Sequence, residues 1–542
     1  MTTTKEFENK VKELIDDLKS VCANYGLGND GNEFKIITQV FLYKFLNDKF
    51  AYEVKKIEPK LANDNKWQET LSNYNKDDYE ILLIQLSEGT AQIQPNHFIS
   101  SLFQKQNEAD FAKLFDNTLL DIAKLNTDVF SVKEDGGAKV ILFDRVSEYV
   151  TISKRDAFCK AIINKLINFS FERIFNEKYD FYATIFEYLI SDYNKDSGGK
   201  YAEYFTPHAV AKIMAACLVA DKVSNVTCYD PSSGSGTLLM SLAHAIGEDK
   251  CTIYSQDISQ KSSSLLRLNL ILNNLVHSIQ NIIQGNTIQN PYHKEDNGEL
   301  EKFDYIVSNP PFKLDFSDYS SDLDTKANNE RFFAGIPKVP KKKKESMSIY
   351  LLFLQHIMHS LTAKGKAAIV VPTGFITAQS GIDKKIRQKM VDSKMLTGVV
   401  SMPSNIFATT GANVSILFLD VCNTEDVVLI DASNLGAKVK DSNGNQKTLL
   451  SGAEEQQIID VFNTKEIKED FSMVVSNDDI KSKNYSLSAG QYFEVKIEYV
   501  DITQEEFKTK LKDFESNLNS LFEESKTLEK EIQGNFKTLD YE

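Results

Sequence analysis

The chain has 542 residues, enough for roughly three or four domains. It carries 62 basic and 77 acidic residues, a net charge of −15, so it lacks the basic surplus of a protein that binds nucleic acid alone. Any nucleic-acid contact is therefore expected to come from another subunit or from a local basic patch. No run of about eighteen apolar residues is present, so no transmembrane helix and no membrane partner are expected.

The cysteines and the amino terminus indicate a reducing compartment. The six cysteines include no C-x-x-C pair, so neither a zinc site nor a disulfide framework is indicated, and no metal site is expected. Charged helical sequence begins at once, without the apolar core of a signal peptide. A cytoplasmic location is therefore expected.

Residues 1–165 carry mostly helical periodicity. Apolar residues share one face of residues 7–18, and residues 34–46 form a strongly apolar helical stretch. His97 stands alone, and no catalytic constellation accompanies it. We predict an N-terminal helical accessory domain over residues 1–165.

The next motif is Glu203-Tyr204-Phe205-Thr206-Pro207, ahead of a helix predicted over residues 208–219. Thr206 is a good N-cap, and Pro207 suits the first helical position. The two aromatic residues before it allow two interpretations. They are either exposed side chains at a helix start or the lining of a pocket for an adenosine-like ligand.

A short strand, residues 226–229, leads into the turn Asp230-Pro-Ser-Ser-Gly-Ser-Gly236 and a helix over 237–246. Two glycines let a ligand approach the backbone, and the helix start offers unpaired N–H groups. The three-glycine dinucleotide fingerprint is not completed. Asp230 would repel a pyrophosphate, so the turn favours a ligand with a cationic end, such as an amino acid ammonium.

Further strands alternate with helices. The strand 251–257 ends in Asp257 about twenty positions after the glycine turn, where a nucleotide-binding βαβ unit places a carboxylate on ribose hydroxyls. A third strand ends at Asn286. The remaining predicted strands are 303–307, 366–372, 398–403 and 414–420. This alternation predicts a doubly wound α/β sheet whose strand ends gather one site.

The fourth strand is followed by Ser308-Asn309-Pro310-Pro311-Phe312. Two prolines cannot continue a sheet ladder, so the strand ends there and holds these residues at the ligand-binding edge. The Asn309 side-chain oxygen and a fixed backbone carbonyl can accept both hydrogens of a planar exocyclic amine, and Phe312 can stack on its ring. The plain alternative is a strand followed by a tight turn. We interpret the stretch as an amine-binding site.

The two motifs together, Asp-Pro-x-x-Gly-x-Gly and Asn-Pro-Pro-Phe, resemble those of S-adenosylmethionine-dependent DNA amino-methyltransferases. With Glu-Tyr-Phe-Thr-Pro ahead of them, they are similar to the γ arrangement of adenine-N6 enzymes. The match is closer still to the modification (M) subunit of type I restriction–modification systems. It extends from the helical amino-terminal region through 405–418 to 484–488, and the paired motifs are highly specific. The resemblance implies a Rossmann-like methyltransferase sheet.

The resemblance also implies residue roles. The implied catalytic residues, which hold the adenine amine and stack on the base, are Asn309, Pro310, Pro311 and Phe312. The implied cofactor-binding residues are Tyr204, Phe205, Thr206, Asp230, Ser232, Gly234, Gly236, Asp257 and Asn286. The chain departs from the common pattern of the family at three places. It has Ser232-Ser233 where the family often has Ala-Cys, and Asp257 where the family commonly has Glu. Asn286 stands where the family often has an acidic residue.

The implied reaction is methyl transfer from S-adenosylmethionine to N6 of an adenine flipped out of double-stranded DNA. The implied partners are a DNA specificity subunit, shared by two M subunits, and a restriction nuclease subunit. Three alternatives stay open: a stand-alone adenine methyltransferase, a methyltransferase acting on RNA or a glutamine side chain, and a scaffolding protein with a degenerate enzyme fold. Only about 120 residues follow the last core strand, which leaves little room for a recognition domain of the chain's own.

The rest of the chain divides into a methyltransferase domain over 166–425, an extension of this core over 426–495 and a helical tail over 496–542. A long loop after Phe312 contains Lys338 and the run 341–344, which is either a solvated segment or a phosphate contact. In the tail, apolar side chains at alternating spacings of four and three, interrupted only by Ser525, form a coiled-coil-like seam. They are Phe507, Leu511, Phe514, Leu518, Leu521, Leu528 and Ile532. Such a seam packs either on its own chain or on the helices of a partner, here the specificity subunit.

Overall fold

The fold was determined as a computed structural model. It describes residues 2–28, 31–64, 66–172, 175, 185, 188, 206–407, 413–440, 446–493 and 503–537. The chain divides into two compact units, Met1–Tyr492 and Phe493–Glu542. None of the helices in the described part of the chain combines the length and the apolar character that a membrane crossing requires.

The amino-terminal region is helical, as predicted. Its longest helices are α1 (Thr2–Asn24), α2 (Gly31–Ile57), α7 (Phe111–Leu125) and α9 (Arg155–Leu166). The shorter helices are α3 (Pro59–Ala62), α4 (Trp67–Ser72), α5 (Lys76–Gln85), α6 (Ile99–Lys105) and α8 (Thr127–Phe130). Helix α2 contains the predicted apolar stretch and is buried along most of its length, because the other helices cover it on several sides. The strongly apolar sequence of α2 is therefore explained by packing.

The second part of the first unit is built on one sheet, which has eleven strands in the described residues. They are β1 (Val132–Glu134), β2 (Lys139–Val140), β3 (Val226–Asp230), β4 (Cys251–Asp257), β5 (Ile282–Gln284), β6 (Phe303–Ser308), β7 (Leu361–Pro372), β8 (Leu396–Ser401), β9 (Val414–Asp420), β10 (Val427–Asp431) and β13 (Ser472–Val475). Their order is β13-β10-β8-β9-β7-β6-β3-β4-β5-β1-β2. All the strands predicted from residue 226 to residue 420 are confirmed.

The centre of the sheet is parallel. Strand β3 pairs in parallel with β4 and β6, which in turn pair in parallel with β5 and β7. Only β9, between β7 and β8, runs antiparallel in this part. Chain order runs outward from β3 to β5 on one side, and from β6 to β7 on the other. The strand order therefore reverses between β3 and β6, and open α/β sheets bind their ligands at such a switch point.

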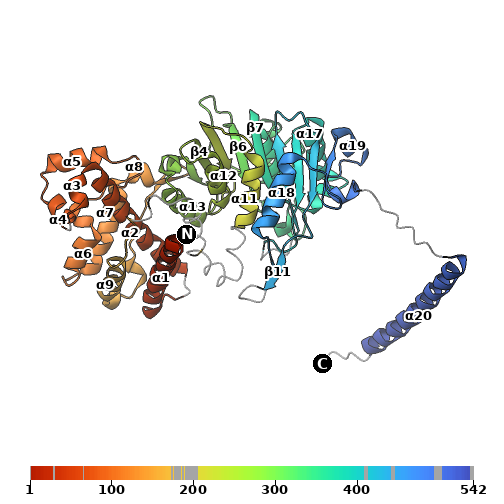
Figure 1. The fold of residues 1–542 in the computed structure, drawn as a ribbon, viewed down its shortest axis with the longest axis horizontal. Coiled ribbons are helices and arrows are strands. Elements are labelled where there is room, and N and C mark those ends of the chain that lie inside the picture. Colours follow the sequence, from red (N-terminus) through yellow and green to blue (C-terminus); the bar gives the residue numbers. More distant parts are fainter. Residues whose placement is uncertain are drawn as a thin grey trace. The chain divides into compact units, whose positions relative to one another are not determined.

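Helices cover the sheet. Helices α11 (His208–Leu218), α12 (Thr237–Ile246) and α18 (Gly452–Thr464) pack in succession and lie in front of the sheet in Figure 1. Helix α13 (Gln260–Leu272) follows β4, while α15 (Tyr350–His359) and α17 (Gly381–Asp392) pack on each other. This alternation of strands and helices confirms the predicted mixed α/β fold.

The sheet is wider than the predicted methyltransferase domain. Strand β1 pairs in parallel with β5, placing Lys133 opposite Ile283. At the other edge, β10 pairs in parallel with β8, and β13 pairs with β10. A separate hairpin joins β11 (Ala437–Lys440) and β12 (Gln446–Leu449), and α19 (Asn477–Ser482) follows β13. The sheet thus continues across the predicted boundaries at residues 165 and 425, which stay predictions.

The loop after Phe312 is a packed segment. It contains α14 (Ser320–Leu323) and two short 3₁₀ turns, Lys326–Asn328 and Lys344–Ser346. Residues of the segment form a separate apolar cluster with Ile288 and the start of α15. Its members are Ile288, Phe316, Leu323, Phe332, Met347, Ile349, Leu352 and Phe353. These side chains do not recur at helical or strand spacing, which is why the sequence indicated only a loop.

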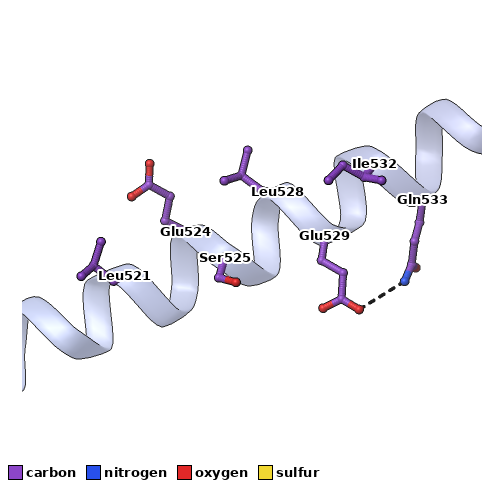
Figure 2. A pocket seen from close by; sticks show the side chains of 7 residues that line it. All are labelled: Leu521, Glu524, Ser525, Leu528, Glu529, Ile532 and Gln533. Atoms are coloured by element: carbon purple, nitrogen blue, oxygen red, sulfur yellow. Dashed lines mark hydrogen bonds between the residues drawn. The ribbon is translucent and has the colours of Figure 1, made fainter. Parts of the chain in front are cut away.

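The second unit contains the helix α20 (Gln504–Lys537), which confirms the predicted helical tail. The seven apolar side chains of the seam are between 51% and 70% exposed. Figure 2 shows that Leu521, Leu528 and Ile532 extend from the same side of the helix. Away from that side, Gln533 donates a hydrogen bond to Glu529 (3.3 Å). Within the second unit itself, the described residues therefore leave the seam largely uncovered.

Candidate active site

The two sequence motifs meet at the point where the strand order reverses. The glycine turn follows β3 and the Asn-Pro-Pro-Phe turn follows β6, and these strands are neighbours in the sheet. The Ser232 and Ser308 hydroxyls join the two turns by a hydrogen bond of 2.8 Å. The structure therefore brings the predicted cofactor side and the predicted catalytic side into direct contact.

Asp230 is buried beneath the glycine turn, with 1% of its surface exposed. Its carboxylate accepts a hydrogen bond from the Ser232 backbone N–H (2.9 Å) and another from the Ser308 hydroxyl. Burial raises the pKa of Asp230 to about 7, and the nearby charge of Asp257 adds to this effect. Ser308 was not predicted as a site residue, although it stands directly before Asn309 in the sequence.

Asp257, at the end of β4, is also buried. One carboxylate oxygen accepts from the Gly234 backbone N–H (2.9 Å) and the other from the Ser259 N–H (2.8 Å). Burial raises the pKa of this carboxyl group as well. Neither Asp257 nor Asp230 forms an ion pair with a described cation. Two buried carboxylates without a cationic partner favour a positively charged ligand.

The glycines of the turn have conformational reasons to be there. Gly234 and Gly236 have φ values of 51° and 85°, in the left-handed region. A Cβ on Gly236 would also lie 2.2 Å from Leu266 Cδ1, so Gly236 lets α12 approach α13. The Ser233 hydroxyl is buried in this turn and has no hydrogen-bond partner among the described residues. A buried hydroxyl without a partner indicates a ligand contact.

Asn309 contacts Thr206, a residue that was predicted to cap the next helix. Its side-chain nitrogen Nδ2 donates to the Thr206 hydroxyl (3.2 Å), and Thr206 is 6% exposed. The prediction that Thr206 caps the next helix is wrong: Pro207 holds the N-cap position of α11, and no side chain caps it. Because Nδ2 is used in this way, the oxygen Oδ1 is left to accept from a ligand. Tyr204 and Phe205 lie outside the described residues.

The residues after Asn309 differ in exposure. Pro310 is buried, Pro311 is exposed and Phe312 is half-buried. The ring of Tyr350, at the start of α15, meets Phe312 edge to face with centroids 6.2 Å apart. The Tyr350 hydroxyl in turn donates to Asp383 (2.7 Å). Tyr350 thus supports the predicted stacking ring, and nothing in the sequence near it indicated this contact.

Two residues follow the second and third parallel strands. The Asn286 side-chain oxygen accepts from the backbone N–H groups of Ile288 (3.1 Å) and Gln289 (3.2 Å), so it shapes its own turn. Its predicted contact to the cofactor stays a prediction. Ile258, directly after Asp257, is 64% exposed, and the sequence analysis did not select it. A large apolar residue next to the predicted ribose carboxylate was the available signal for a surface that packs on a nucleobase.

Comparison with known proteins agrees with this geometry. The N-6 DNA Methylase family matches residues 177–500, more than half of the chain. The chain is 26% identical over 544 residues to the type I restriction enzyme MpnII methylase subunit of Mycoplasma pneumoniae, with 96% of each protein covered. It is 26% identical over 390 residues to the type I restriction enzyme MjaIX methylase subunit of Methanocaldococcus jannaschii, covering 69% of this chain and 65% of that protein.

The fold is also similar to a solved structure. The crystal structure of the type I restriction-modification system methyltransferase subunit from Streptococcus thermophilus has a TM-score of 0.71 and 22% sequence identity. The likeness covers 90% of this chain and 100% of that one, and at this identity it concerns the fold alone. The family match, by contrast, spans both motifs, from the glycine turn to the Asn-Pro-Pro-Phe turn. The chain therefore belongs to the N-6 DNA methylase family.

Proposed function

We propose that the chain transfers a methyl group from S-adenosylmethionine to N6 of an adenine in DNA, as the methylase subunit of a type I restriction–modification enzyme. The observation that carries this proposal is the Asn309 amide. Thr206 holds its nitrogen, so its oxygen is left to accept from an amine. The buried carboxylate of Asp230 lies one strand away, and that of Asp257 lies one strand further. An amine acceptor beside a cation-binding turn suits amino-group methylation.

The residues at the glycine turn fit S-adenosylmethionine, which carries positive charge on both its ammonium and its sulfonium. Asp230 would hold the ammonium, and the unpaired Ser233 hydroxyl is a further donor or acceptor for the methionine part. Asp257 would accept from the ribose hydroxyls. Ile258 would pack on the adenine ring of the cofactor, near Asn286. When bound, this cofactor would supply an electrophilic methyl group.

The adenine N6 lies inside the duplex, so the target base must be flipped out to reach the site. Asn309 Oδ1 and the Pro310 carbonyl would accept the two N6 hydrogens, while Phe312 stacks on the base. Held in this way, the nitrogen would be oriented to attack the methyl carbon: the C–N bond would form as the S–CH3 bond breaks, the thioether S-adenosylhomocysteine would be the leaving group, and one N6 proton would pass to solvent. Positioning and electrostatics therefore supply the rate, and no strong base is needed.

The affinity for S-adenosylmethionine is expected to depend on pH. Asp230, with a pKa of about 7, is largely protonated below that pH and ionised above it. The cationic ligand binds the ionised form, so the dissociation constant should rise by up to about tenfold for each pH unit below 7 and level off above about 8. Calorimetric titration at several pH values below 7 and above 8 measures this dissociation constant. Asp230→Asn should bind more weakly and give a flatter profile. An affinity of the wild-type protein that does not change with pH would contradict this role.

The exposed lysines of the segment after Phe312 are proposed as contacts to the phosphates of double-stranded DNA. Lys338 and Lys341–Lys344 are all exposed, and none forms an ion pair with a described carboxylate. They lie in the same segment as the apolar cluster that holds it beside the site. A local basic patch close to the site would explain how an acidic protein contacts DNA.

Replacing Lys341, Lys342, Lys343 and Lys344 together by glutamine should weaken DNA binding at every sequence. Each phosphate contact that is lost should reduce the slope of log affinity against log salt by about one unit. The measurement is a salt titration of the complex on labelled DNA. The matched control changes four exposed lysines of the amino-terminal region, Lys60, Lys66, Lys76 and Lys124. Equal slopes for the two variants would show that the 341–344 run is only solvated.

The proposed partner of the seam on α20 is a DNA specificity subunit, shared by two methylase subunits, and a nuclease subunit completes the restriction enzyme. The seam is exposed over most of a helix roughly 50 Å long, which suits a partner helix. Residues 501–542 carry six lysines and eleven acidic residues, so DNA itself is a poor partner for this tail.

The main alternative is a methyltransferase that reads its own target. The type I methylase subunit from Mycoplasma pneumoniae aligns with this chain over 96% of each protein, which supports the type I subunit over the stand-alone enzyme. The test is methyl transfer to DNA with and without a cognate specificity subunit. Sequence-specific transfer only in its presence is expected. Specific transfer by the chain alone would favour the stand-alone enzyme.

A further inference from the structure

A buried arginine of the segment after Phe312 joins parts of the site that are far apart in the sequence. Arg331 is 3% exposed. Its guanidinium donates to the carbonyl oxygens of Thr287 (2.8 Å, from Nη2) and Ile288 (2.8 Å, from Nη1), and to Nδ1 of His356 (3.0 Å, from Nε). Burial lowers the pKa of Arg331 to about 10, so the side chain is still charged at neutral pH. Arginine alone has the planar fork that serves all three acceptors at once.

His356 carries this contact on to the glycine turn. Because Arg331 can only donate, the Nδ1 atom of His356 must be unprotonated, and its proton lies on Nε2. Burial, with the charge of Arg331, holds the pKa of His356 well below its ordinary value, so the ring stays neutral. Nε2 lies 3.3 Å from the hydroxyl of Tyr229 and donates to it. Tyr229 is 2% exposed and immediately precedes Asp230.

A second connection runs through Thr287. Its hydroxyl donates to the carbonyl oxygen of Pro231 (2.7 Å), the residue after Asp230. The carbonyl group of the same Thr287 accepts from Arg331. Arg331 is therefore joined to the start of the glycine turn from two sides, by His356 through Tyr229 and by Thr287 through Pro231.

On the other side, Arg331 belongs to the segment that begins directly after Phe312. Gln355, beside His356 on α15, accepts from the Ala334 backbone N–H (2.7 Å) and donates to the Gly335 carbonyl (3.0 Å). The neighbouring Phe332 is part of the separate apolar cluster. The backbone around Arg331 is therefore fixed, so the position of Arg331 relative to Thr287 and Ile288 is fixed too.

We propose that Arg331 is a positioning residue, which holds the segment behind the target-base site in a fixed position relative to the turn that binds the methyl donor. The inference rests on the proposed methyl transfer and adds to it a residue that touches neither cofactor nor base. Its role is to keep the methyl carbon and the adenine nitrogen in line. Loss of that alignment slows the transfer step and leaves the two binding sites themselves intact.

The test compares two buried arginines in the assembled complex. Arg331→Lys keeps the charge but can serve only part of the acceptor set. The matched control is Arg267→Lys in α13. Arg267 is 6% exposed and donates to the carbonyls of Phe130, Val140 and Ile141, none of which belongs to either turn. Thermal unfolding of both variants measures the structural loss. Single-turnover methyl transfer to saturating DNA, with calorimetric titration of S-adenosylmethionine, measures alignment and binding separately.

The single-turnover rate of Arg331→Lys should fall on the order of 10- to 100-fold, because small misplacements of reacting groups cost that much. Its affinity for S-adenosylmethionine should change no more than that of Arg267→Lys, which should react at the wild-type rate. Equal rates for the two variants, or a loss confined to cofactor affinity, would overturn the proposal. If the wild-type complex itself transfers no methyl group, the proposed function fails instead.

Thr287→Val keeps the test decisive if Arg331→Lys does not fold. The substitution is nearly isosteric and removes only the hydroxyl that donates to Pro231. The single-turnover rate should again fall with little change in the melting temperature. A variant that reacts at the wild-type rate would show that the connection between Arg331 and the glycine turn does not affect the transfer step.

Discussion

Replacing Asn309 by alanine is expected to abolish methyl transfer while S-adenosylmethionine still binds. The Asn309 side chain offers its oxygen to the target amine and contacts Thr206, whereas the cofactor is assigned to the glycine turn one strand away. Loss of the amide should lower the transfer rate by at least about 10²- to 10³-fold, the effect of removing one fixed polar group that stabilises a transition state. Transfer of a labelled methyl group to DNA measures the rate, and calorimetry measures cofactor binding.

Thr206→Val is a second variant, for which an intermediate effect is expected. It is nearly isosteric and removes only the hydroxyl that orients the Asn309 amide. Its transfer rate should lie between those of the wild type and Asn309→Ala, with cofactor affinity close to the wild-type value. If Asn309→Ala methylated DNA at a rate near that of the wild type, the Asn-Pro-Pro-Phe turn would not be the catalytic site.

Deleting the residues after about position 500 should prevent assembly with the specificity subunit and abolish sequence-specific methylation. The first compact unit ends at Tyr492, so the deletion removes only the second unit and leaves the described cofactor site complete. S-adenosylmethionine should therefore bind as before. Co-purification with the specificity subunit and methylation of its target measure the two losses. A truncated protein that assembled and methylated normally would show that the tail serves another purpose.

Point variants can separate the seam from the helix as a whole. Leu511→Glu with Leu518→Glu places two charges in the seam, where both side chains are more than half exposed. The matched control, Thr509→Glu with Ser516→Glu, adds the same charge at the same spacing on another face of α20. Assembly should fail only with the seam variant. Failure of both variants would point to the helix charge, and success of both would exclude the seam as the contact.

The regular parts of the fold could be predicted because each strand is a short apolar run followed by a distinct polar end. The strands ending at Asp230, Asp257 and Ser308 belong to this class. The pairing of β1 with β5 could not be predicted, because Val132–Glu134 is one apolar residue followed by two charged ones and contains no apolar run. The same holds for the segment after Phe312, whose core depends on contacts to α15 and Ile288.

The residues of the site likewise divide into those that the sequence predicted and those that only the structure showed. The acidic, glycine and amide residues were found because their chemistry is local to one turn, and a resemblance joined the turns. The contact between Thr206 and Asn309 spans 103 positions and depends on how α11 meets the sheet. Arg331 and His356 act through backbone carbonyls and a ring nitrogen, so their partners leave no mark in the sequence. Such contacts become visible only in the folded chain.

The most direct test of the proposed function is the identity of the methylated nucleoside. The complex of this chain with its specificity subunit would be incubated with unmethylated DNA and labelled S-adenosylmethionine, and the DNA would be digested to nucleosides and analysed by mass spectrometry. The label should appear as N6-methyldeoxyadenosine with the wild-type chain and be absent with Asn309→Ala. Label in a methylated cytosine, or in protein or RNA with none in DNA, would contradict the assignment.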